Sequence, residues 1–366
     1  MSALSFERID VHRLCVPLVT PYRLAFGSVE HFDTLVIEVT DRDGQVGLGE
    51  ATVLTGYTDE TIDDSWKVAN EFAATLASGA STDIDHDTAM VGRGYPFTAT
   101  AFGTAFEMLR GSPLLRVSAP TRVPLLGLLH AEHEHEIAAE FDALLAAGFR
   151  TVKVKVGFDA EADARRVKAV QRVVAGRARI RLDANQGYSE EQGVAFVRAL
   201  DPADIELFEQ PCAAGDWDAH LAVARAAAVP MMLDESIYGL ADIERAAKLR
   251  AASYIKLKLM KCVSLERLLA ALGRIRSLGM TAVLGNGVAC DLGCWMEACI
   301  AARAIDNAGE MNGWLKARGH LLTQALRFDK GSVILDPGFA PRFDRKAVAP
   351  FLVQSTSFAR AKNHAH

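Results

Sequence analysis

The fold is decided by three short stretches of sequence, TVKVKVGF at 151–158, RIRLDAN at 179–185 and IELFEQP at 205–211. Each contains a short apolar run of the length expected for a buried strand. The segments between them, 160–174 and 190–200, are rich in alanine and have helical periodicity. Strands that alternate with helices in this way predict parallel β-α-β units.

The same alternation continues on both sides of these stretches. We expect strands at 124–129, 151–156, 179–183, 205–209, 231–234, 254–259 and 281–284. An eighth strand near 309–312 is less clear in the sequence. A series of β-α units of this length predicts an α/β protein whose strands close into a barrel.

The N-terminal third has a different pattern. Alternating stretches at 6–18 and 33–40, the second followed by an Asp43-Gly44 turn, predict an antiparallel sheet. Helical periodicity follows from 59 to 115. We therefore expect three parts: an α+β domain at 1–122, the barrel at 123–327, and a C-terminal segment at 328–366 that packs back on the first domain.

Composition excludes several classes of function. The net charge is -6 and the 40 Lys and Arg residues form no basic block, so we expect no nucleic-acid partner. The charged N-terminus has neither a signal-peptide core nor the length of a membrane span, which predicts a cytoplasmic protein without a membrane partner. The six cysteines include no Cys-x-x-Cys pair and are expected to be free thiols. We also expect a homo-oligomer.

Acidic residues recur at the carboxyl ends of the predicted barrel strands. Asp183, Glu209 and Asp234 end three successive strands, and barrel folds place their active sites at that end. Each acid alone is equally consistent with a helix cap or a loop residue. Together they supply hard oxygen ligands, which suit Mg²⁺ and also Mn²⁺.

Two strands carry lysine pairs in an apolar context, Lys153 with Lys155 and Lys256 with Lys258. Alternate residues of a strand face one way, so each pair shares a face, either toward the barrel mouth or outward. Crowding and burial disfavour the ammonium form, and a pKa lowered from about 10.4 toward about 7–8 produces a usable general base. The alternative for the first pair is a strand with one lysine that reaches past the barrel rim.

Five motifs, in this order along the chain, resemble those of the enolase superfamily, specifically its muconate lactonizing enzyme subgroup. They are Lys153-Val-Lys155, Asp183-Ala-Asn185, Glu209-Gln-Pro211, Asp234-Glu-Ser236 and the stretch 255–261. The resemblance covers the whole chain. It implies a modified TIM barrel, (β/α)7β, with an N-terminal α+β capping domain.

The resemblance also implies roles for the site residues. Asp183, Glu209 and Asp234 would hold Mg²⁺. Lys155 and Lys258 would be the catalytic residues on opposite faces of the substrate, and Lys153 and Asn185 would assist them. The chemistry implied is removal of the proton α to a carboxylate through an enediolate, as enolase-superfamily sites perform with a Lys or His base and Mg²⁺.

Four further residues are predicted to contact the substrate. Arg23 and Tyr57 occupy positions where this family closes loops over its substrate. Asn286 stands where the mandelate racemase subgroup would have a histidine, so a lysine–lysine site is the better match. Dipeptide epimerases usually have an Asp-x-Asp pair near the last strand, where this chain has Gly309-Glu310-Met311-Asn312. Glu310 would bind a substrate cation there or have a structural role.

Two other patterns have competing interpretations. His130, His133 and His135 are spaced as zinc ligands or as the polar start of a helix. The glycine-flanked loop at 284–287 would either hold a phosphate, as barrels often do after late strands, or make room for the substrate.

These predictions converge on a magnesium-dependent racemase or epimerase. Its substrate would be a small carboxylate, an amino-acid or imino-acid derivative. A dehydratase that eliminates a β-hydroxyl, for example from a hydroxyproline, or a cycloisomerase of the muconate type would use the same apparatus. A binding protein that inherited the barrel is the alternative from another class, but a retired site has no reason to keep like charges together.

Overall fold

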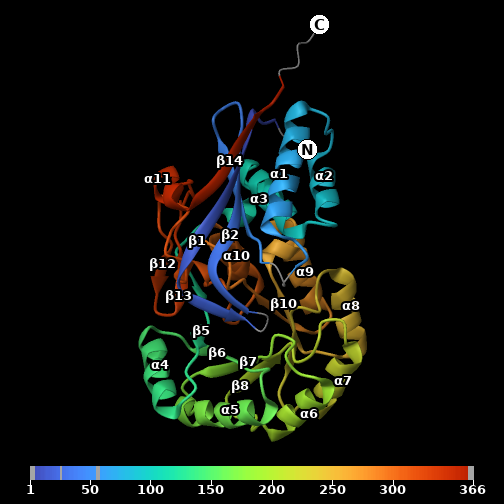
Figure 1. The fold of residues 1–366 in the computed structure, drawn as a ribbon, viewed down its shortest axis with the longest axis vertical. Helices are drawn as coiled ribbons and strands as arrows, with labels where there is room; N and C mark the ends of the chain where they lie inside the picture. Colours follow the sequence, from blue (N-terminus) through green and yellow to red (C-terminus); the bar gives the residue numbers. More distant parts are fainter. Residues whose placement is uncertain (1–4, 25–26, 55–57, 362–366) are drawn as a thin grey trace.

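The computed structural model describes residues 5–24, 27–54 and 58–361, and for residues 22–24 and 27 it describes the backbone alone. Figure 1 shows a strand-rich lobe stacked above a curled sheet that is ringed by helices. Within the described ranges, no helix is both long and apolar enough to cross a membrane.

The upper lobe, called the capping lobe below, contains an antiparallel sheet in the order β14-β1-β2-β3. Its strands are β1 (Arg8–Leu24), β2 (Gly27–Thr40), β3 (Val46–Thr52) and β14 (Leu352–Ala359). Strand β14 comes from the C-terminal part of the chain and lies beside β1 (Figure 1). Both ends of the chain therefore contribute to one sheet.

Three helices complete this lobe. They are α1 (Ile62–Ser78), α2 (Ile84–Val91) and α3 (Pro96–Leu109). The Thr61 side chain caps α1 by accepting a hydrogen bond from the backbone N–H of Asp64. Helix α3 packs directly on β3 because Gly49 has no side chain, and a Cβ there would lie 1.8 Å from the carbonyl oxygen of Ala101.

The lower lobe is a parallel seven-stranded sheet, curled into a half-barrel, with strands in the order β11 to β5. The strands are β5 (Gly127–Leu129), β6 (Thr151–Lys155), β7 (Arg179–Asp183), β8 (Ile205–Glu209), β9 (Met231–Leu233), β10 (Tyr254–Leu257) and β11 (Thr281–Leu284). The connecting helices are α4 (Glu134–Ala146), α5 (Ala160–Val174), α6 (Glu190–Ala199), α7 (Trp217–Ala226), α8 (Leu240–Leu249), α9 (Leu265–Ser277) and α10 (Asp291–Ala304). Helices α4 to α8 form the outer arc in Figure 1.

The segment at 309–312 closes the barrel. The backbone N–H of Leu126 donates to Gly309, and that of Glu310 donates to Leu284, each at 3.0 Å. The segment thus bridges the two ends of the seven-stranded sheet at the place of the expected eighth strand, but as an isolated bridge with Leu125 rather than a regular strand.

A small antiparallel sheet joins the segment before the barrel to the C-terminal part of the chain. It consists of β4 (Thr121–Pro124), β13 (Ser332–Leu335) and β12 (Arg327–Asp329), and the short helix α11 (Arg345–Val348) follows it. The prediction of one strand over 124–129 is therefore wrong in extent. The chain changes sheets at Pro124, which has no N–H to continue a ladder.

The other predicted barrel strands agree with the structure to within one or two residues at their ends. Helix α5 has the predicted bounds, and α6 ends one residue before the expected 200. All six cysteines are free, as expected.

Candidate active site

Three acids lie side by side at the carboxyl ends of neighbouring strands. Asp183 ends β7 and Glu209 ends β8, and the two are register partners. Asp234 directly follows β9. Their exposed fractions are 0%, 0% and 1%. Burial of three carboxylates at one point is costly unless cations compensate for it.

The first lysine pair supplies part of that compensation. Lys153 Nζ lies 2.8 Å from an oxygen of both Asp183 and Glu209. Lys155 Nζ lies 2.6 Å from Asp183 Oδ2 and also donates to Asn185 Oδ1. Both lysines line the pocket at the barrel mouth, so the pair faces inward rather than outward.

The second lysine pair approaches from β10. Lys258 Nζ lies 2.8 Å from Asp234 Oδ2, and Lys256 Nζ lies 3.0 Å from Glu209 Oε1. Burial lowers the pKa of Lys258, against the opposing effect of Asp234. The surroundings of Lys258 therefore disfavour its ammonium form more than water does.

The acids differ in their ionisation. Burial opposes the charged form of Asp183, but Lys153, Lys155 and Lys256 outweigh it and hold its pKa below the ordinary range. Burial and the neighbouring Asp183 raise the pKa of Glu209 to about 7. Glu209 Oε2 is buried without a well-directed hydrogen bond, although Lys153 lies close to it.

This donor set fits a hard divalent cation. The oxygens are carboxylates on rigid strand ends, and the buried Glu209 Oε2 has no well-directed hydrogen bond in the described part of the chain. The acids do not meet as a closed group, because the ammonium groups of Lys153 and Lys256 lie between them. In the described part of the chain, ligand atoms within 4.8 Å of one another are found for Cys15, His31 and Asp33 instead.

Asn185 connects the lysine side of the site to a fourth acid. Its backbone has φ 41, and its amide group donates to Glu235 Oε1 at 3.0 Å. Burial raises the pKa of Glu235, with Asp234 and Asp183 adding to the shift. Glu235 was not predicted as a site residue, although it follows a predicted metal ligand in the sequence.

A further unpredicted lysine is buried beside Asp234. Lys261 donates to the backbone carbonyl oxygens of Asp234 and Ile237 at 3.2 and 3.1 Å, and its Nζ lies 4.3 Å from the centre of the Tyr238 ring. Burial lowers the pKa of Lys261 to about 8. Lys261 lies within the stretch 255–261 that resembles a family motif. Its hydrogen-bond partners, however, belong to the loop after β9, so the stretch alone does not reveal them.

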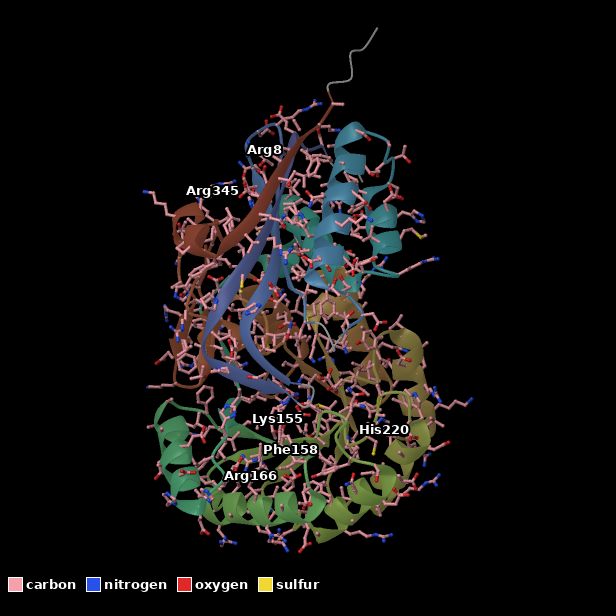
Figure 2. The ribbon with its side chains drawn as sticks, viewed as in Figure 1. Arg8, Lys155, Phe158, Arg166, His220 and Arg345 are labelled. Carbon is pink, nitrogen blue, oxygen red and sulfur yellow. The ribbon has the colours of Figure 1, made fainter. Side chains whose placement is uncertain are left out.

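Arg166 on α5 fixes the end of β6. Its guanidinium donates to the carbonyl oxygens of Lys155 at 2.9 Å and Ala131 at 3.0 Å. Figure 2 labels Lys155 below the lower ends of the capping strands, with Arg166 further down in the barrel lobe. The backbone that carries Lys155 is thus held from outside the pocket.

The structure describes the side chains of only some of the residues predicted to contact the substrate. Asn286 is buried and lines the pocket, together with the apolar side chains of Leu54, Met260 and Val288. Leu54 belongs to the capping lobe, so this lobe forms part of the pocket wall. The side chain of Arg23 and the whole of Tyr57 lie outside the described residues.

Glu310 faces into the barrel, and each oxygen of its carboxylate accepts a hydrogen bond from a lysine. Its Oε1 accepts from Lys153 at 2.7 Å and its Oε2 accepts from Lys256. Lys256 was recognised as half of a pair but not as a site residue. The signal for it was the period of two in Lys-x-Lys, which places both lysines on one face.

The histidine pattern and the glycine-flanked loop each had two interpretations from the sequence, and the structure favours one for each. His133 and His135 stack on each other at the start of α4, and the three histidines form no metal-binding group among the described residues.

In the loop after β11, the N–H of Asn286 donates to Glu297 Oε2 at 3.0 Å and that of Val288 donates to Asn286 Oδ1 at 3.1 Å. These amides are engaged by protein atoms, which disfavours a phosphate cradle.

Family models match both lobes. The mandelate racemase/muconate lactonizing enzyme N-terminal domain matches residues 8–105, and the enolase C-terminal domain-like family matches residues 136–347. The chain belongs to the enolase superfamily. This confirms the predicted superfamily and its muconate lactonizing enzyme subgroup, and the barrel with an N-terminal strand-rich domain agrees with the predicted fold class.

Relatives include several isomerases. L-Lys-D/L-Arg epimerase of Methylococcus capsulatus is 31% identical, with 82% of this chain and 85% of that protein covered. L-Ala-D/L-Glu epimerase of Bacillus subtilis is 29% identical, with 81% and 84% covered. These relatives support an isomerase of small molecules, and members of the superfamily use a divalent metal, typically Mg²⁺.

Solved structures share the fold. A dipeptide epimerase from Cytophaga hutchinsonii, complexed with Mg and the dipeptide D-Ala-L-Val, superimposes with a TM-score of 0.85 over 97% of this chain and 100% of that one, at 19% identity. Muconate lactonizing enzyme from Pseudomonas fluorescens, complexed with muconolactone, has a TM-score of 0.84 over 95% and 99%, at 23% identity.

Proposed function

We propose that the protein is a magnesium-dependent racemase or epimerase that acts on the carbon next to the carboxylate of an amino-acid or imino-acid derivative. The observation that carries this proposal is the placement of Lys155 and Lys258 across the acid cluster. Lys155 contacts Asp183 from β6 and Lys258 contacts Asp234 from β10, with β7, β8 and β9 between them. A substrate carboxylate held above the acids would lie between the two ammonium groups.

Two lysines on opposite sides provide one proton-transfer group for each face of a planar carbanion. The neutral lysine removes the α-proton, and the opposite ammonium returns a proton to the other face. For the reverse reaction the two lysines exchange their roles. The lowered pKa of Lys258, which results from burial, makes its neutral form accessible nearer to neutrality.

Asp183, Glu209 and Asp234 are the residues that would hold Mg²⁺. When bound, the ion would stabilise the negative charge that develops on the substrate carboxylate. Lys153 contacts two of these acids and lies at the base of the pocket. Asn185 holds Lys155 in place through its side-chain oxygen, and this contact orients the proton-transfer group.

The substrate class follows from the remaining pocket wall and from the relatives. Leu54, Met260 and Val288 offer apolar contacts beyond the charged base of the pocket. Two of the relatives are named as a hydrophobic dipeptide epimerase and an N-succinyl-L-Arg/Lys racemase. We therefore propose an amino-acid derivative substituted on its nitrogen.

Deuterium exchange with single-lysine variants tests the proposal. In deuterated water with Mg²⁺, Lys155→Ala should exchange the α-proton of one enantiomer of a substrate, and Lys258→Ala that of the other. Neither variant should racemise either enantiomer. Lys168→Ala removes an exposed lysine of α5 and is the matched control with unchanged racemisation.

The substrate screen should contain N-acyl amino acids, dipeptides, proline derivatives and hydroxyprolines. Release of water with a keto or imino product would replace the racemase by a dehydratase. Loss of exchange with both enantiomers in both variants would contradict the assignment of one lysine to each face.

A further inference from the structure

Cys15, His31 and Asp33 form a side-chain cluster in the capping lobe, on strands other than those that carry the acids of the barrel. Cys15 on β1 is the register partner of Asp33 on β2, and His31 is two residues before Asp33 on the same strand. Alternation therefore puts all three on one face of the sheet. Leu14, Val16 and Phe32, which alternate with them, are 0% exposed in the core.

The geometry of the cluster matches that of a small metal site. A sulfur, a ring nitrogen and a carboxylate oxygen all lie within 4.8 Å of one another. His31 Nε2 and Asp33 Oδ2 are 3.3 Å apart, and two ligands about 2.0–2.1 Å from a tetrahedral Zn²⁺ are separated by roughly 3.3 Å. Adjacent antiparallel strands thus preorganise three ligand atoms without a loop rearrangement.

We propose that Cys15, His31 and Asp33 bind a borderline-soft divalent transition metal of the Zn²⁺ class. Thiolate and imidazole ligands select such ions, whereas the all-carboxylate donor set in the barrel suits hard ions such as Mg²⁺. The chain therefore has two metal sites of different ligand chemistry. A cavity of about 380 Å³, lined in part by His31 and Asp33, lies beside the cluster.

Metal binding at this cluster requires loss of the thiol proton. Burial raises the pKa of the Cys15 thiol, and Asp33 adds to the shift while Arg13 opposes it. A bound metal ion would displace that proton and release it to solvent. Proton release on binding is therefore a second signature of the site, besides the metal itself.

Cobalt spectroscopy tests the site directly. The full chain, saturated with Mg²⁺, would be titrated with Co²⁺ while the thiolate-to-cobalt charge-transfer band in the near ultraviolet is recorded, and Zn²⁺ affinity would follow from competition. One equivalent should produce the band, and Zn²⁺ should abolish it. Carboxylate-bound Co²⁺ in the barrel gives no such band, so the result is independent of the proposed racemase activity.

Variants decide between a metal site and a simple His31–Asp33 ion pair. Cys15→Ser should remove the band, and His31→Gln and Asp33→Asn should weaken Zn²⁺ binding by more than the roughly 10- to 100-fold that loss of an outer-shell partner costs. Cys262→Ser and the exposed His86→Gln, outside the cluster, should bind as the wild type does. Unchanged metal-free melting temperatures would establish that the cluster variants are folded. No band in the wild type, or a band that persists in Cys15→Ser, would overturn the proposal.

Discussion

Glu310 and Lys256 form an ion pair in the interior of the barrel, with Glu310 Oε2 accepting from Lys256 Nζ. The other oxygen of the same carboxylate accepts from Lys153 at 2.7 Å. One carboxylate therefore holds both lysines that stand behind the proposed proton-transfer pair. Burial opposes its ionisation, but Lys153 and Lys256 hold the pKa of Glu310 below the usual range.

Replacement of this carboxylate should destabilise the fold. Glu310→Gln leaves Lys153 and Lys256 with one counter-charge fewer at a buried position, and loss of one partner of a buried pair costs about 3–5 kcal/mol. We expect a decrease of that size in the free energy of unfolding, measured by urea denaturation without metal.

The control for this experiment is an exposed pair of the same chemistry. Glu134→Gln removes the partner of Arg172, 2.7 Å away at the surface, and should cause no measurable loss of stability. A Glu310→Gln protein with wild-type stability but weaker substrate binding would support the sequence-based interpretation of Glu310 as a substrate contact.

Chelation should abolish activity. Asp183, Glu209 and Asp234 offer hard oxygens, so Mg²⁺ or Mn²⁺ should restore turnover after treatment with a chelator and removal of the chelated metal. Binding can be followed without turnover by the electron paramagnetic resonance of Mn²⁺. Asp183→Asn, Glu209→Gln and Asp234→Asn should each weaken Mn²⁺ binding strongly, and Glu191→Gln, an exposed acid on α6, should not. Full activity of metal-depleted enzyme would exclude the metal mechanism.

The acids and lysines of the candidate site could be predicted because barrel geometry depends on simple periods. Asp183 and Glu209 end predicted strands, and parallel strands bring such ends together. Lys153 and Lys155 share a face because the side-chain period of a strand is two. These local rules place residues without any knowledge of tertiary contacts.

The partners of these residues depend on longer-range contacts. Glu310 meets Lys153 across 157 positions of sequence, and no local pattern distinguishes this contact from binding of a substrate cation. The eighth strand was unclear for a related reason, since Gly309 and Glu310 bridge the two ends of the sheet through isolated hydrogen bonds. The contacts of Lys261 arise only when the loop after β9 is in place.

Gly285 illustrates how structure resolves an ambiguous motif. The sequence predicts that the loop at 284–287 either holds a phosphate or makes room for the substrate, but the φ of Gly285 is +136 and a Cβ there would lie 2.4 Å from the backbone nitrogen of Glu310. Gly285→Ala should therefore disrupt barrel closure and destabilise the protein by at least roughly 1–3 kcal/mol, the cost of backbone strain alone. Thermal and urea unfolding would measure the loss.

The matched control is a glycine with space around it. Gly273 lies within α9, and a Cβ there meets no atom within 4 Å. Gly273→Ala should stabilise the protein by about 0.5–1 kcal/mol through helix propensity. Equal effects of the two substitutions would contradict the role assigned to Gly285.

We expect His220 to make the free energy of unfolding depend on pH. It is buried on α7, with its Nε2 lying 3.1 Å from Ser236 Oγ and 3.2 Å from Gln210 Nε2. The side-chain oxygen of Gln210 in turn accepts from the backbone N–H groups of Asp234 and Ser236. The network thus supports the loop that carries a proposed metal ligand.

Burial lowers the pKa of His220 from 6.5 to about 4 in the folded protein. Between these two values the unfolded chain binds more protons than the folded chain, so the free energy of unfolding decreases as the pH falls. For one histidine with this shift the loss approaches about 3 kcal/mol at the low end of the window. His12, whose pKa burial also lowers to about 4, should add a similar contribution.

The contribution of His220 can be isolated by comparing how steeply the free energy of unfolding changes with pH in the wild type and in variants. The free energy of unfolding would be measured by urea denaturation from pH 7 to pH 4 for the wild type, for His220→Gln and for His86→Gln, which replaces an exposed histidine. His220→Gln has no titrating imidazole, so its stability should decrease less steeply over this range even if it is lower at pH 7. His86→Gln should retain the wild-type slope. A wild-type slope in His220→Gln would show that this histidine does not carry the acid sensitivity.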